Sequence, residues 1–237
     1  SISGAMFSAV RQLPNTPIYD PSTPTGYNIF TAGTTSMVGQ WDNYIPITSS
    51  LTNIAYIVNN NKYQSDLSRF IGSIAADVKI TDWANYKLQV SKDRSVTTGF
   101  LYWNRVHGDG FSRGGYIDNN YLNLDRWNIQ NILDLKKSFL DHNFNLVLVN
   151  EYQKQRNNSF FGDGQGLSTD FFGQVNLISG SYTTQLSGGS ASENGLISYA
   201  ARLSYNYANK YFVQGTVRRD GLSALLTANK WGNFQGI

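Results

Sequence analysis

Hydrophobic and polar residues alternate regularly over residues 197–207. Side chains two positions apart share one face of a strand, so this alternation predicts a β-strand with one apolar and one polar face. The pattern resumes after the short polar segment 208–210, which predicts a hairpin. The apolar face carries Ile197, Tyr199, Ala201, Leu203, Tyr205, Tyr207, Tyr211, Val213 and Val217, and the polar face carries Ser198, Ala200, Arg202, Ser204, Asn206, Gln214, Thr216 and Arg218.

Four earlier stretches alternate in the same way and are predicted strands, at about residues 67–80, 86–103, 122–139 and 144–155. Short turns alternate with long polar connections, which are predicted at residues 104–121 and 157–194. Soluble sheets have strands of about five or six residues, whereas a membrane-spanning strand needs about 9–11. Long strands with short turns at one end and long loops at the other are typical of outer-membrane barrels.

Aromatic residues gather near both ends of the predicted strands. One group lies beside the short turns and comprises Trp83, Tyr86, Phe139, Phe144, Tyr207 and Tyr211. The other lies near the far strand ends and comprises Tyr102, Trp103, Trp127, Tyr152 and Tyr199. Two such belts mark the two interfaces of a membrane.

The polar strand face carries charges that a dry core would not accommodate without partners, among them Arg126, Asp134, Lys136 and Arg202. A water-filled lumen accommodates them. We therefore predict an all-β fold that is part of a large antiparallel transmembrane β-barrel, with about six strands, short periplasmic turns and long extracellular loops. A β-sandwich is the weaker alternative.

The chain is predicted to have three regions. Residues 1–66, which contain four prolines between positions 14 and 24, form an extracellular loop region with short irregular elements. Within it, residues 51–58 form a turn of helix or a short strand. Residues 67–222 form the transmembrane barrel segment, and residues 223–237 begin the next extracellular loop and strand.

Composition narrows the class of protein. Aromatic residues make up 14% and charged residues 15% of the 237 residues, and the net charge of +3 contains no block of like charges. A nucleic-acid partner is therefore not expected. The chain has no cysteine, no apolar run of about 20 residues, and no signal-peptide pattern at its start. We expect it to be an internal piece of a longer protein.

Candidate catalytic and metal-binding groups are sparse, so no enzyme activity, cofactor or metal is expected. The only histidines are His107 and His142. His107 could be grouped with Asp109 and Ser112 as a hydrolase triad, but three polar residues in one loop are common and no G-x-S-x-G motif supports it.

The segment FFGDGQGLSTD could hold calcium through Asp163 and Asp170. It lacks the alternating acidic positions of a calcium loop, which favours a flexible loop instead. The Gly-rich segment HGDGFSRGG lacks the lysine of a phosphate-binding loop.

Two motifs near the C-terminal end are specific. The run LISYAARLSYNYANKYFVQGTVRRDG, followed by NKWGNF, closely resembles the SusC/RagA family of TonB-dependent outer-membrane transporters. NFNLVLVNEYQKQ resembles the strand that precedes a large extracellular loop in that family, and the resemblance covers about residues 50–237. The sequence departs from the family in LSALLTANK, which follows RRDG, and after NF. The motif residues, Arg218, Arg219, Asp220, Gly221, Trp231 and Gly232, are assigned a structural role.

The resemblance implies a portion of a 22-stranded plugged barrel in the bacterial outer membrane, embedded in lipid. It implies active import of an oligomeric nutrient, either a glycan or a peptide. TonB would supply the energy through an N-terminal region that this sequence lacks, and a SusD-like surface lipoprotein would be the partner. The alternatives are a passive porin-like or structural barrel and a secreted β-sandwich carbohydrate-binding protein.

Candidate substrate-binding residues follow from the predicted loops and lumen. The loop aromatics are Tyr102, Trp103, Tyr116, Tyr121, Phe160 and Phe161, and the lumen polar residues are Arg126, Asn128 and Arg202. Aromatic faces stack on sugar rings and accept peptide side chains, although about half of these rings are expected to be interfacial anchors. Arg218 is predicted to face the lumen, with Arg219 at the rim paired to Asp220.

Overall fold

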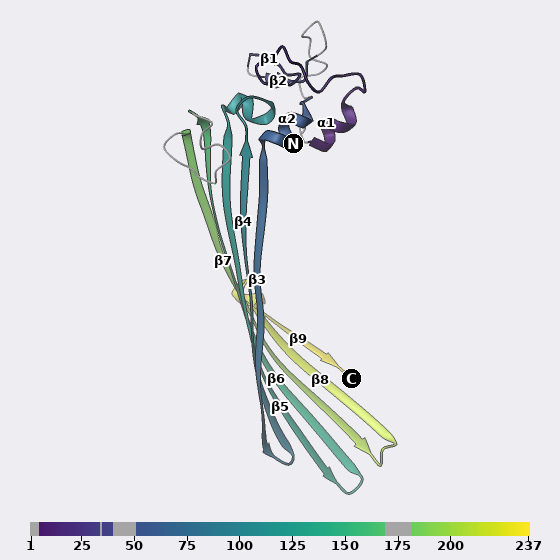
Figure 1. The fold of residues 1–237 in the computed structure, drawn as a ribbon. Coiled ribbons are helices and arrows are strands. Elements are labelled where there is room, and N and C mark those ends of the chain that lie inside the picture. The colour runs from purple at the N-terminus through teal and green to yellow at the C-terminus, as the bar shows by residue number, and fades with distance from the viewer. Residues whose placement is uncertain (1–4, 34, 40–50, 169–181) are drawn as a thin grey trace. The chain divides into compact units, whose positions relative to one another are not determined.

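The computed structural model describes residues 5–33, 35–39, 51–168 and 182–237. Its main element is a seven-stranded sheet in the order β3-β4-β5-β6-β7-β8-β9, so every strand lies beside its neighbour in sequence (Figure 1). The strands are β3 (Lys62–Thr81), β4 (Ala84–Trp103), β5 (Tyr116–Phe139), β6 (His142–Leu167), β7 (Tyr182–Tyr207), β8 (Tyr211–Leu222) and β9 (Trp231–Gly236). All six predicted strands are present, and β9 lies within residues 223–237, where the start of a further strand was predicted.

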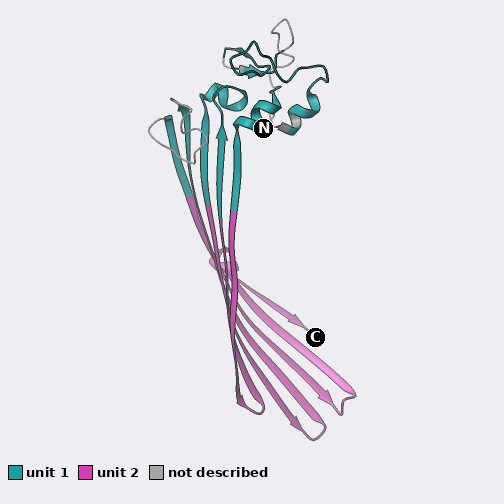
Figure 2. Ribbon diagram, viewed as in Figure 1, with its two compact units in different colours: residues 1–66, 97–121, 160–189 teal, residues 67–96, 122–159, 190–237 magenta. Residues whose placement is uncertain are grey.

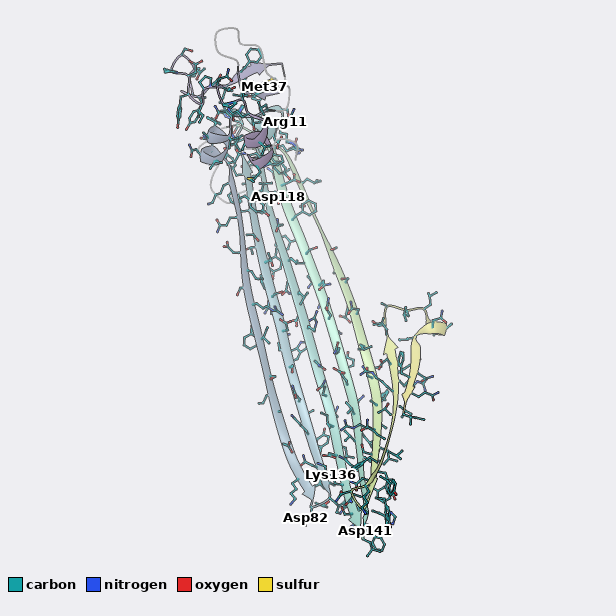
Figure 3. All side chains as sticks on the ribbon, turned by 90° about the vertical axis from the view of Figure 1, so that its right-hand side faces the viewer. Arg11, Met37, Asp82, Asp118, Lys136 and Asp141 are labelled. Carbon is teal, nitrogen blue, oxygen red and sulfur yellow. The ribbon has the colours of Figure 1, made fainter. Side chains whose placement is uncertain are left out.

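The chain divides into two compact units (Figure 2). Unit 1 comprises residues 1–66, 97–121 and 160–189, and unit 2 comprises residues 67–96, 122–159 and 190–237. Unit 2 contains the short turns. Asp82 and Asp141 mark the turns of the β3–β4 and β5–β6 hairpins at the same end of the strands (Figure 3).

The predicted hairpin at residues 197–218 is confirmed by the pairing of β7 with β8. Tyr207 lies opposite Tyr211 and Ala201 opposite Val217, so the predicted apolar residues share one face of the two strands. The turn places Ala208 and Asn209 in the left-handed region, with φ of 53° and 54°. This conformation suits asparagine better than alanine.

Three strands extend further than the alternation predicts. β5 begins at Tyr116, β6 continues to Leu167 and β7 begins at Tyr182. The prediction of loops over residues 116–121, 157–167 and 182–194 was therefore wrong. Glycine, serine and asparagine are weak strand formers, but pairing with neighbouring strands satisfies the backbone and outweighs that preference. The rest of the second predicted loop, residues 169–181, lies outside the described residues.

The N-terminal region contains short elements. They are α1 (Ala5–Arg11), β1 (Phe30–Ala32), β2 (Thr35–Met37) and α2 (Ile54–Asn60), and the two 3-10 helices η1 (Gly108–Arg113) and η3 (Thr227–Asn229) lie in later loops. The helix alternative for residues 51–58 is correct, since the side chain of Asn53 caps α2 by accepting from the Tyr56 amide. None of the described helices combines the length and apolar character needed to cross a membrane.

Little apolar surface of the sheet is buried. One small core cluster in unit 1 joins Phe100, Tyr102, Ile117, Leu167 and Tyr182. In unit 2 the apolar strand face is open instead, with Ile74 75% exposed and Val213 62% exposed. Exposed apolar surface of this kind is typical of a face that contacts lipid or another protein.

Candidate functional site

The polar face of unit 2 holds a row of charged groups across three strands. The Arg69 guanidinium on β3 binds Asp93 on β4 in a bidentate manner, with Nε–Oδ1 and Nη2–Oδ2 distances of 2.9 and 2.8 Å. Arg126 on β5 lies 3.7 Å from the same carboxylate and donates to Gln155 Oε1 on β6 at 2.8 Å. These mutual bonds fix the side chains in position.

Glu151 on β6 is the centre of a second polar cluster on this face. Its Oε1 accepts hydrogen bonds from Asn128 at 3.0 Å, Gln130 at 3.0 Å and Gln153 at 2.9 Å. The side-chain amide of Asn128 is thereby oriented with its Oδ1 buried and without a partner among the described residues. An unpaired buried carbonyl is an available acceptor for an N–H or O–H group of a ligand.

The RRDG motif differs from its prediction in one pairing. Asp220 binds Arg218, with an Nε–Oδ1 distance of 2.8 Å, and not Arg219 as predicted. The reason is the strand geometry, because residues two apart share a face whereas adjacent residues do not. Arg218 also donates to Ser198 Oγ on β7 at 3.2 Å, which joins β7 to β8.

The other motif residues meet on the opposite face of β8 and β9. The Arg219 guanidinium lies 4.7 Å from the centre of the Trp231 ring. A Cβ at Gly221 would lie 2.8 Å from that ring, so a larger residue would displace the indole from its position in this structure. Gly232 is less constrained, since a Cβ there would lie 3.2 Å from the Phe234 ring.

The six candidate aromatic residues all lie in unit 1, whereas Arg126, Asn128 and Arg202 lie in unit 2. Trp103 and Tyr116 face each other at 5.0 Å, and the Arg113 guanidinium lies 5.4 and 5.0 Å from the two ring centres. Together these three side chains are called the Arg113 cluster below. It presents a cation and two aromatic rings within one small region.

Tyr121 stacks on Phe160 at 5.0 Å with the rings 22° from parallel. Phe160 and its neighbour Phe161 are 59% and 37% exposed. Tyr102 is different, because it is only 4% exposed within the core cluster. The Tyr102 ring is therefore not accessible to a ligand in this structure. Arg202 is exposed on β7.

Several residues of these clusters were missed from the sequence. They are Arg113, Asp93, Glu151 and Gln155. Asp93, Glu151 and Gln155 occupy polar-face positions of predicted strands, so alternation was the available signal. Arg113 had no signal, because its ring contacts depend on how the loop 104–115 folds.

His107 does not form the hydrolase triad considered from the sequence. It is fully buried, and its Nε2 accepts from the Asn53 amide at 2.7 Å. The ring proton is therefore on Nδ1, which donates to Ser36 Oγ at 2.8 Å. Both ring nitrogens are used, and burial lowers the pKa of His107 to about 4. His107 is a neutral structural residue.

No protein-family model matches the chain. The TonB-dependent receptor P3 of Formosa agariphila is 34% identical over 125 residues, which cover 53% of this chain and 12% of the receptor. TonB-dependent receptor P39 of the same organism is 38% identical over 56 residues, which cover 24% of this chain and 5% of the receptor.

Two solved structures share the fold at low sequence identity. The RagAB peptide transporter superposes with a TM-score of 0.70 at 16% identity, covering 92% of this chain and 23% of that chain. The RagAB peptide importer in its closed-closed state superposes with a TM-score of 0.68 at 15% identity, covering 95% of this chain and 26% of that chain. The predicted fold, part of a large antiparallel β-barrel, is thus confirmed, as is the resemblance to TonB-dependent receptors. The chain spans only a small part of the relatives it matches.

Proposed function

We propose that this chain, similar to TonB-dependent receptors in sequence and to RagAB in fold, forms part of the wall of a bacterial outer-membrane transporter. The observation that carries the proposal is the difference between the two faces of the sheet in unit 2. One face exposes apolar side chains, and the other holds hydrogen-bonded charges and amides. Lipid on one side and water on the other satisfy both faces.

The apolar face ends at a definite position along the strands, on the side away from the short turns. This end supports the proposal that the face contacts lipid. Beyond Trp127 on β5, positions of the same face become charged. Lys92 pairs with Asp125 and lies 3.9 Å from the centre of the Trp127 ring. Ion pairs of this kind belong in the headgroup region or in water, with the aromatic ring at the interface.

A second ion pair lies on the same face of the next strands. Lys154 on β6 binds Glu193 on β7 at 2.8 Å. Because β5, β6 and β7 all continue past these pairs, the strands project beyond the hydrocarbon layer. We assign the projecting parts and the N-terminal region 1–66 to the extracellular side, residues 67–222 to the barrel segment, and residues 223–237 to the next extracellular loop and strand.

The transported molecule is proposed to be an oligomeric nutrient, and a peptide is favoured over a glycan. The structures that share the fold are described as a peptide transporter and importer. On the polar face, Asn128 Oδ1 is a free acceptor for a peptide N–H group. Trp103, Tyr116, Phe160 and Phe161 offer ring surface to side chains, and Arg202 offers a charge.

The proposed partners follow from the motif resemblance to the SusC/RagA family. A TonB complex would supply the energy, and a SusD-like surface lipoprotein would bind the extracellular side. The protein is proposed to be a transporter and not an enzyme. His107, the residue most open to a catalytic interpretation, is fully buried with both ring nitrogens bonded.

Uptake by intact cells tests this function. Cells carrying the full-length protein, cells lacking it and cells lacking TonB are given a mixture of labelled peptides and oligosaccharides, and depletion from the medium is followed. The proposal expects peptides to be depleted only when both the protein and TonB are present. Depletion of oligosaccharides alone would retain the transporter and reject the peptide. Uptake that continues without TonB would indicate a passive barrel.

A further inference from the structure

The register between β5 and β6 in unit 1 brings two carboxylates together. The Leu167 amide donates to Gly114 O at 2.8 Å, and the Gly166 amide donates to Gly115 O at 3.3 Å. Further along the same strands, Tyr121 stacks on Phe160. In antiparallel strands each step forward on one is matched by a step back on the other, and both ends of this stretch give the same register.

Asp118 lies three residues after Gly115, and Asp163 lies three residues before Gly166. They therefore lie directly opposite each other on one face of the sheet, where Cβ atoms are about 4.5–5.5 Å apart. Figure 3 labels Asp118 on the part of β5 that belongs to unit 1. Like charges in this arrangement destabilise a sheet unless something neutralises them.

The carboxylate of Asp163 is buried and incompletely hydrogen-bonded. Its side chain is 8% exposed, and its Oδ1 has no hydrogen-bond partner among the described residues. A buried carboxylate oxygen without a donor is costly. The pKa of Asp163 is raised first by burial and then by the charge of Asp118, which agrees with their closeness.

The neighbouring arginine does not neutralise the pair by direct contact. The charge of Arg113 acts on Asp163, but its guanidinium lies over the rings of Trp103 and Tyr116. The amide of Asn120 donates to Asp118 Oδ1 at 3.3 Å and brings no charge. The two carboxylates thus lack a bound cation among the described residues.

We propose that Asp118 and Asp163 bind a divalent cation of the calcium type. Calcium takes six to eight oxygen ligands, and carboxylates are its preferred charged ligands. The described residues contain no group of three or more histidines, cysteines or acidic residues suited to a metal. Water and main-chain oxygens therefore complete the coordination. The sequence suggested Asp170 as the partner of Asp163, but Asp170 lies outside the described residues.

A cation at this position would hold β5 to β6 beside the Arg113 cluster. It would neutralise the repulsion between the strands and fix the register that presents Trp103 and Tyr116. Sites with few charged ligands on extracellular modules bind calcium with dissociation constants of about 10⁻⁴–10⁻³ M. The site does not depend on which nutrient is transported.

Calcium binding to the full-length protein in detergent tests the proposal. Isothermal titration with calcium is combined with luminescence of terbium, which Trp103 and Tyr116 would sensitise from the neighbouring positions. We expect saturable binding that weakens at least tenfold in Asp118→Asn and in Asp163→Asn. Asp125→Asn is the matched control, because Asp125 lies on the same strand but is paired with Lys92. It should bind calcium as the wild type does.

A charge replacement keeps the test decisive if the asparagine variants fail to fold. Asp118→Lys supplies a covalent cation opposite Asp163, so this variant should fold without calcium and show no calcium-dependent rise in melting temperature. The wild type should show such a rise and lose it with a chelator. Absence of calcium binding in the wild type, or binding unchanged in both asparagine variants, would overturn the proposal.

Discussion

The side chain of His107 joins segments that are far apart in the sequence. The ring accepts a hydrogen bond from the Asn53 amide at the start of α2 and donates one to Ser36 in β2. The backbone amide of His107 donates to Asn104 Oδ1 at 2.8 Å. Asn104 in turn donates to Asn61 through its amide and side chain. Both ring nitrogens of His107 have a hydrogen-bond partner in this network. The network fixes the N-terminal region against η1 within unit 1.

Acid should loosen this region. The pKa of His107 is about 4 in the folded protein against 6.5 for a free side chain, so the neutral form stabilises the fold fully above pH 6.5. Stability is lost as the pH falls from 6.5 towards 4, by about 3 kcal/mol in total. The protection factor of the Asn53 amide, which corrects its exchange rate for the intrinsic pH dependence of amide exchange, should fall over this range. His107→Gln retains a donor and an acceptor without titrating, so the protection factor in this variant should not change over the same range.

A side chain should disturb one glycine position of β8 and not another. Gly221→Ala should destabilise the full-length protein by about 1 kcal/mol, because the new Cβ would lie 2.8 Å from the Trp231 ring, which is 41% exposed and would have to move. Gly215→Ala on the same strand is the control, since a Cβ there meets nothing within 4 Å. Denaturant unfolding in detergent would measure both. Equal effects of the two substitutions would contradict the assigned role of Gly221.

At the scale of the strand, neighbouring residues on β6 test which face contacts lipid. Leu148 lies on the apolar face and is 38% exposed, whereas Val147 points to the polar face. Leu148→Arg should cost about 2–4 kcal/mol of stability in a bilayer, and Val147→Arg much less. The comparison is made by unfolding the protein from phospholipid vesicles. A larger cost for Val147→Arg would mean that the faces are assigned the wrong way round.

Alternation alone was enough to predict the hairpins and the two faces, because burial and solvation repeat every two residues along a strand. It was not enough to predict strand length. Residues 157–167 and 182–194 alternate weakly and are rich in serine, glycine and asparagine, so their strand state depends on the neighbouring strands. The predicted pairing of Arg219 with Asp220 was wrong for a simpler reason. Residues two apart share a face of a strand, so Arg218 is the partner of Asp220.

The carboxylate pair could have been found from the turn of the β5–β6 hairpin. Phe139 ends β5 and His142 begins β6, so counting outward from this two-residue turn places Asp118 opposite Asp163. The prediction of loops at residues 104–121 and 157–194 prevented that count, because Asp118 lies in the first and Asp163 in the second. The Arg113 cluster, by contrast, depends on a folded loop and could not be obtained from periodicity.

At the scale of the whole molecule, β3 and β9 are the edges of the sheet. Strand edges leave backbone hydrogen-bonding groups unpaired, which favours aggregation in water. An exposed apolar face favours aggregation further. A barrel in a membrane removes both problems, because further strands pair with the edges and lipid covers the apolar face. The chain matches 12% of the length of the receptor P3, which is consistent with such a larger structure.

The central claim is that this sheet separates lipid from water, and accessibility along β7 tests it most directly. Single spin labels are placed at each position from 200 to 205 of the full-length protein in lipid vesicles. The 237 residues contain no cysteine, and any cysteine elsewhere in the full-length protein is first replaced by serine. The account predicts that oxygen, which partitions into lipid, relaxes labels at Ala201, Leu203 and Tyr205. A water-soluble nickel chelate should relax labels at Ala200, Arg202 and Ser204. Labels at the odd positions that neither reagent reaches would instead show a dry protein core and contradict the barrel.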